Sequence, residues 1–168
     1  MGSRWTLALA LLLGACTKEK PPAPAPSVAD AGVSPKPAAG LDSMQQFLVD
    51  TGAKDLRAAK EALARGENPL HLCAAVTSGV PKLAKVEAPA AQELVEEATR
   101  SCGFEIPLAW GERLVKKMRA VREERPAEVF FVECVEVEMA VDGMTEERRK
   151  DPKIVALLKD HAELCTQP

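Results

Sequence analysis

AQELVEEATRSCG, residues 91–103, is the stretch that decides the fold class. Its apolar residues return at intervals of three and four, which is the spacing of one face of an α-helix. The residues on this face are Ala91, Leu94, Val95, Ala98 and Cys102. Because Gly103 follows the last of them and glycine commonly ends helices, the stretch predicts an amphipathic helix that closes at Gly103.

Five other segments carry helical spacing or helix-boundary residues. Two of them begin with a capping residue that is followed by a proline in the first turn. These capping residues are Asn68 and Asp151. A Ser-x-x-Gln capping box opens the first at Ser43, and Gly79 with Pro81 predicts that the second stops there. The predicted helices are 43–65, 69–78, the stretch that closes at Gly103, 107–124, 128–141 and 152–165.

Residues 128–141 form the ambiguous segment. Its first twelve residues, EVFFVECVEVEM, are rich in β-branched residues and partly alternate, so propensity alone would accept a strand. No other segment offers a strand to pair with it, and a lone strand leaves backbone groups without hydrogen-bond partners. The context therefore predicts a helix here, and for the domain an all-α bundle of five or six helices.

The chain before residue 41 has a different composition. Arg4 precedes the short apolar run 5–13 and small residues, which is the layout of a secretory signal and too short to span a bilayer. The Pro- and Ala-rich residues 18–40 offer too little apolar surface to fold. The predicted organisation is a signal peptide over 1–15, a tether over 16–40 and a helical domain over 41–168.

The tetrapeptide Leu13-Gly14-Ala15-Cys16 resembles the lipobox of bacterial lipoproteins, and the resemblance covers only the first 16 residues. It implies that the signal peptide is cut before Cys16 and that acyl chains such as palmitate anchor Cys16 to a membrane. Thr17 stands where many lipoproteins retained at the inner membrane have aspartate, which favours the outer membrane. The alternative is an ordinary cleaved signal followed by a chance cysteine.

Four further cysteines lie in the domain: Cys73, Cys102, Cys134 and Cys165. An even number in an exported domain indicates two disulfides. Each sequential pair is about 30 residues apart and spans two predicted helices, which suggests two disulfide-stapled hairpins. A simple hairpin would offset the two cysteines by roughly 10 Å, whereas a disulfide needs Cα atoms within about 7 Å. Pairing across the hairpins, Cys73 with Cys165 and Cys102 with Cys134, therefore stays open.

Charge and composition exclude some partners. The chain has 22 Lys and Arg against 25 Asp and Glu, and four of the basic and two of the acidic residues precede Leu41. The domain is therefore acidic, without the basic face that a phosphate backbone requires, so no nucleic-acid partner is predicted. The chain has no Tyr, two Trp and four Phe, so aromatic platforms for bases or sugars are scarce.

One cluster departs from this acidic balance and is a candidate contact for an acidic partner or an anionic polymer. It consists of Arg113, Lys116, Lys117, Arg119 and Arg122. The alternative interpretation is a solvated helix face opposite Glu-rich neighbours, which is the commoner use of such a run.

Catalytic and metal motifs are scarce. The sequence has no G-x-S-x-G, S-x-x-K or Gly-rich phosphate loop, so no catalytic site is predicted. His161 lies four residues before Cys165, a helical metal-ligand spacing, and His71 lies two before Cys73. Because disulfides usually consume cysteines in an oxidising compartment, we predict no metal and no cofactor.

These observations favour a lipid-anchored module of the cell envelope with a binding or structural role, whose partner is another envelope protein. The alternative is a carrier of a small apolar ligand between helices, which needs an internal cavity. A third possibility is a zinc or redox protein that uses Cys73, His161 and Cys165.

Overall fold

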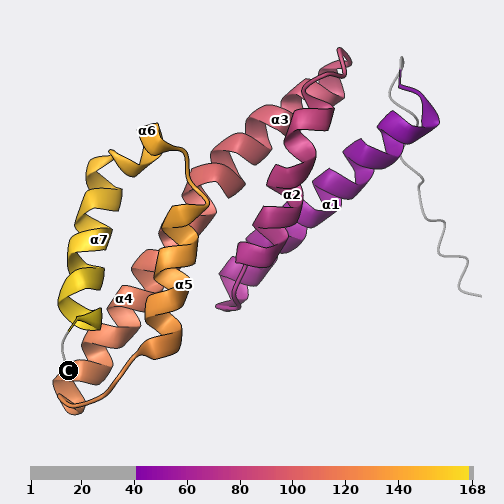
Figure 1. The fold of residues 1–168 in the computed structure, drawn as a ribbon. Coiled ribbons are helices and arrows are strands. Elements are labelled where there is room, and N and C mark those ends of the chain that lie inside the picture. Colours follow the sequence, from indigo (N-terminus) through magenta and orange to yellow (C-terminus); the bar gives the residue numbers. More distant parts are fainter. Residues whose placement is uncertain (1–40, 167–168) are drawn as a thin grey trace, which may run out of the picture. The chain divides into compact units, whose positions relative to one another are not determined.

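The structure, a computed structural model, describes residues 41–166. Every regular element in this range is a helix, and no strand occurs within it (Figure 1). The elements are α1 (Ser43–Arg65), α2 (Leu70–Leu83), α3 (Pro89–Arg100), η1 (Ser101–Glu105), α4 (Ile106–Glu124), α5 (Phe131–Asp142), α6 (Glu146–Arg149) and α7 (Pro152–Cys165). The predicted all-α bundle is confirmed. The predictions for residues 1–40, including the signal peptide, the tether and Cys16, lie outside the described residues.

Helix α1 has the predicted bounds but a different cap. An Asp42 side-chain oxygen accepts the Gln45 N–H at 2.7 Å, and the Gln45 side chain accepts the Asp42 N–H at 3.0 Å. The capping box therefore begins one residue before Ser43, the position that the sequence predicts. At the other end, Gly66 adopts a φ of 77°, a left-handed conformation that glycine takes without Cβ strain.

Helix α2 begins as predicted but is longer. The Asn68 side chain accepts the Leu70 N–H at 2.9 Å, which satisfies a backbone donor of the first turn. The helix then continues through Gly79 and Pro81 to Leu83. Pro81 lacks an N–H and removes one helical hydrogen bond, but the side chain of Leu83 is buried in the core. The predicted stop at residue 78 is wrong because burial beyond the proline offsets this loss.

Gly103 does not end a helix either. Helical backbone continues from α3 through the π-helical turn η1 into α4, as Figure 1 shows. In an α-helix Pro107 could not donate to the carbonyl of Gly103, so the regular hydrogen-bond pattern is interrupted at this point in any case. Here the Ile106 N–H bonds to the carbonyl of Ser101, five residues earlier. The predicted break between two separate helices is therefore wrong.

Two buried apolar clusters hold the helices together. The first joins α1, α2 and α3 and contains Leu56, Val76 and Leu94. The second joins α4, α5 and α7 and contains Met118 and Ile154 among others. The continuous α3–η1–α4 helix contributes buried residues to both clusters, so it is the element that connects the two halves of the bundle.

Each half carries one disulfide, and the sequential pairing is confirmed. Cys73 bonds to Cys102 with Cα atoms 4.8 Å apart, and Cys134 bonds to Cys165 with Cα atoms 5.9 Å apart. The expected offset does not prevent the first pair, because α2 extends to Leu83 and Cys73 therefore lies further before the end of its helix than predicted. In the second pair the short helix α6 lies in the connection between α5 and α7.

No helix between residues 41 and 166 is both long enough and apolar enough to cross a membrane.

Candidate functional site

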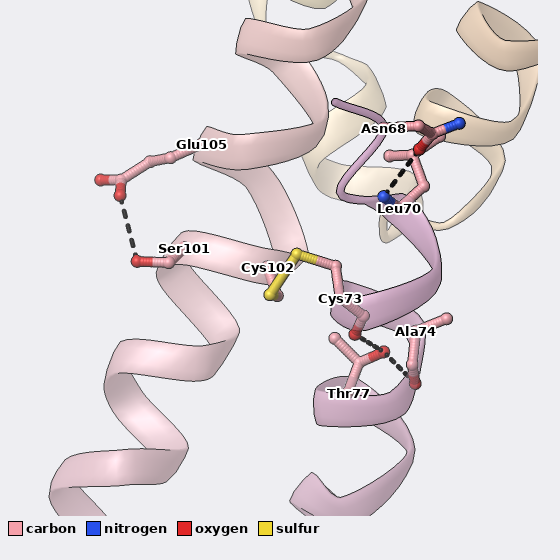
Figure 2. The surroundings of a disulfide bond; sticks show 8 residues. All are labelled: Asn68, Leu70, Cys73, Ala74, Thr77, Ser101, Cys102 and Glu105. Carbon is pink, nitrogen blue, oxygen red and sulfur yellow. Dashed lines mark hydrogen bonds between the residues drawn. A yellow bond between two sulfur atoms is a disulfide. The ribbon is translucent and has the colours of Figure 1, made fainter. Parts of the chain in front are cut away.

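The Cys73–Cys102 disulfide is a buried link between α2 and η1 (Figure 2). Both cysteines belong to the first apolar cluster and are almost fully covered. The Thr77 hydroxyl next to them donates to the Cys73 carbonyl at 2.9 Å, and the Ser101 hydroxyl faces Glu105 at 3.4 Å. The bond is enclosed by the core, as expected of a structural disulfide.

The Cys134–Cys165 disulfide is different because it is partly exposed and has a histidine beside it. A ring nitrogen of His161 and the two sulfur atoms all lie within 4.8 Å of one another. The His161 side chain is only 12% exposed, and its Nε2 lies 3.1 Å from the Cys134 carbonyl oxygen. A carboxylate oxygen of Glu138 lies 3.8 Å from the same nitrogen. Residues from α5 and α7 thus form a compact Cys–Cys–His cluster.

The structure separates the other cysteine and histidine named by the sequence. Cys73 is bonded to Cys102 in the other half of the bundle, and His71 is exposed on α2. Within residues 41–166 the cluster at His161 is the group of three such side chains close enough to share a metal ion. The sequence analysis grouped His161 with Cys165 and Cys73, whereas the second cysteine beside it is Cys134, the partner that the sequential pairing gives to Cys165.

Two of the basic residues on α4 are paired with acidic residues of the same domain. The Lys117 ammonium donates to Glu133 on α5 at 2.9 Å, and this hydrogen bond lowers the pKa of the Glu133 carboxyl from its ordinary value. Arg119 forms an ion pair with Asp160 on α7. Both pairs join α4 to its neighbours.

Two more basic residues bind backbone carbonyls. Arg113 donates to the Leu63 carbonyl, near the end of α1, at 2.6 Å. Arg122 donates to the carbonyl of Leu164, near the end of α7, at 3.0 Å, and its guanidinium lies 5.1 Å from the centre of the Phe130 ring. Carbonyls in the last turn of a helix lack a partner in the regular helical pattern, so Arg122 supplies a donor to the Leu164 carbonyl. The Leu63 carbonyl also accepts the Gly66 N–H at 3.1 Å, so Arg113 adds a second donor there.

Lys116 instead borders a hollow between α4 and α7. The hollow measures about 580 Å³ and opens to solvent. Its lining includes Glu112, Lys116, Arg119, Glu123, Lys153 and Asp160 around a few apolar side chains. Six of its ten lining residues are charged, whereas a pocket for a small apolar ligand usually has few charged groups.

The outward surface of α5 carries four large apolar side chains. Phe131 is 76% exposed, Val132 62%, Val135 38% and Met139 57%. Three of them recur every four residues, and Val137, on the opposite side of the helix, is fully buried. We call these four residues the α5 outer face. The helix is therefore apolar on both sides, which explains why its sequence has no clear helical period.

No protein-family model, curated protein or solved structure matches this chain, so its function is argued from the residues described above.

Proposed function

We propose that this protein is a binding module of the cell envelope, anchored through a lipid on Cys16, that holds another envelope protein against the α5 outer face. The observation that carries the proposal is that α5 exposes Phe131 and Met139 while burying Val137 on its other side. Large apolar side chains on two opposite sides of a helix are normally covered on both. The uncovered side is therefore the candidate docking surface.

The arrangement of the exposed apolar side chains supports a specific contact. Single exposed hydrophobic residues are common on soluble proteins, whereas a continuous apolar stripe often marks an interaction site. Fully covering one large aliphatic or aromatic side chain contributes roughly 1.5 to 3 kcal/mol. Four such side chains in adjacent turns could form the centre of a small interface, whose surrounding contacts must supply the rest of the cost of association.

The charges around the stripe indicate the chemistry of the partner. Glu138 and Asp142 lie on the same helix and are 60% and 77% exposed. The domain as a whole is also acidic. We therefore expect a partner segment with apolar side chains flanked by Lys or Arg, whose charges would increase the association rate and make it depend on salt.

The test is site-specific photo-crosslinking in cells that make the full chain. A photoreactive residue at Val135 should capture one partner protein, and the captured peptide should contain apolar residues next to Lys or Arg. The same probe at Arg57, exposed on α1, is the matched control and should not capture it. In the Val135 probe chain, Met139→Asp should abolish capture. A capture that survives this substitution, or that yields a second copy of the chain, would contradict the proposal.

The anchor is tested separately by fractionation. Cys16→Ser should move the protein from the membrane fraction to the soluble envelope fraction, because a lipid is the proposed attachment. A protein that remains in the membrane fraction after this substitution is not held there by an acyl chain on Cys16.

A further inference from the structure

We propose that Cys134, Cys165 and His161 form a binding site for a thiophilic divalent cation such as Zn²⁺, which becomes available when the disulfide between the two cysteines is reduced. The inference is independent of the docking proposal, since it concerns the inner side of α5 and its contact with α7. It rests on the three ligand atoms lying within 4.8 Å of one another.

The geometry is close to that of a metal site. Zn²⁺ binds thiolate sulfur at about 2.3 Å and imidazole nitrogen at about 2.0 to 2.1 Å in a tetrahedron, which places neighbouring ligand atoms nearly 4 Å apart. The two sulfurs of a disulfide, about 2 Å apart, must therefore separate by rotation of their side chains. Three protein ligands leave a fourth position that solvent can fill, since the cluster is partly exposed.

His161 is already held in place. Its Nε2 lies 3.1 Å from the Cys134 carbonyl oxygen and 3.8 Å from a Glu138 carboxylate oxygen. Metal-bound histidines are usually oriented by a hydrogen bond from one ring nitrogen to a carbonyl or carboxylate, which leaves the lone pair of the other nitrogen for the metal. The groups around His161 include both kinds of acceptor.

The helices that carry the ligands do not depend on the disulfide alone. Val137 on α5 and Ile154 on α7 are fully buried in the same apolar cluster. The Arg119–Asp160 and Lys117–Glu133 pairs also join α7 and α5 to α4. The ligands should therefore stay near one another after reduction.

The chemical steps balance with a dithiol as the reductant. The dithiol transfers two electrons and two protons to the Cys134–Cys165 bond and itself becomes a disulfide. The cation then replaces both thiol protons, which pass to solvent, and binds neutral His161. Because Cys73 and Cys102 are buried and the second pair is partly exposed, the dithiol should reduce the second pair first.

The test uses the full chain carrying Cys16→Ser, so that its only cysteines are the four of the domain. The protein is treated with increasing dithiol, the reductant is removed without air, and Co²⁺ is added as a spectroscopic probe. We expect thiolate-to-cobalt absorption bands in the reduced protein but not in the oxidised one. One equivalent of Zn²⁺ should remove these bands, and His161→Asn should weaken Co²⁺ binding at least tenfold.

Two variants are matched controls. His71→Asn changes the other histidine near a cysteine pair and should leave the Co²⁺ bands unchanged. Cys73→Ser with Cys102→Ser removes the buried pair and should also keep them. The proposal is wrong if the reduced protein gives no thiolate bands, or if His161→Asn binds Co²⁺ as tightly as the parent. It is also wrong if reduction removes the helical circular dichroism and Zn²⁺ does not restore it.

Discussion

The same substitution, glycine to alanine, should have opposite effects at Gly111 on α4 and Gly79 on α2. A Cβ added at Gly111 would lie 2.7 Å from Leu157 Cδ2, a contact too short for carbon atoms. A Cβ added at Gly79 would meet nothing within 4 Å. Both glycines are inside helices, so the gain in helix propensity is the same and the difference measures the contact between α4 and α7.

The magnitudes follow from these two effects. Replacing glycine by alanine inside a helix adds about 1 kcal/mol to the free energy of unfolding. Overpacking a buried contact typically costs 1 to 3 kcal/mol, and Leu157 is buried. Gly79→Ala should therefore stabilise the protein by about 1 kcal/mol, and Gly111→Ala should destabilise it by about 1 kcal/mol.

Urea unfolding followed by circular dichroism measures both changes, and Leu157→Ala supplies a further control. The three atoms nearest to the added Cβ at Gly111 all belong to the Leu157 side chain. In the Leu157→Ala background, itself less stable by roughly 2 to 5 kcal/mol, Gly111→Ala should become stabilising because the contact is gone. The reasoning is refuted if Gly111→Ala stabilises the parent protein as much as Gly79→Ala does.

Three other changes test the disulfide, an ion pair and the docking surface. Replacing Cys73 and Cys102 by alanine should lower the free energy of unfolding by about 3 to 4 kcal/mol, as loop closure over 29 residues predicts; an unchanged urea midpoint would contradict this. Because Lys117 lowers the pKa of the Glu133 carboxyl, this pair stabilises the fold above the ordinary glutamate pKa, and the stabilisation is lost as pH falls through the lowered pKa. Glu133→Gln should therefore reduce the stability lost on acidification by at most about 1 kcal/mol. If urea unfolding at several pH values gives the same loss for the variant and the parent, the assignment is wrong. Met139→Lys should change stability by no more than about 0.5 kcal/mol, and a larger loss would show that the side chain supports the fold.

Two helix starts were predicted correctly from local capping residues, whereas two predicted helix ends are wrong. Asn68 and Asp151 act through hydrogen bonds to backbone donors two residues away, so their effect can be inferred locally. Pro81 and Gly103 have local preferences that favour a stop, yet the helix continues past both. The burial of Leu83 and the π-turn before Pro107 decide these cases, and neither is visible in a window of a few residues.

The disulfide pairing shows how such an error spreads. With α2 ending at residue 78, the expected offset between Cys73 and Cys102 leaves two pairings open. Once α2 reaches Leu83, that objection to the sequential pairing disappears. The spacing of the cysteines therefore indicated the correct pairing, but the true length of α2 was needed to decide between the two alternatives.

The candidate docking surface predicted from the sequence differs from the one that the structure favours, for a related reason. The basic residues of α4 form a cluster in sequence, but Lys117 and Arg119 reach acidic partners on α5 and α7 that only the tertiary structure identifies. Contact of these residues with an acidic partner protein stays a prediction, and such a partner would have to compete with the internal pairs. The side chains of Phe131 and Met139 have no such competition, because covering them breaks no ion pair and removes apolar surface from water. On this balance of costs, the α5 outer face is the better place for a partner to bind.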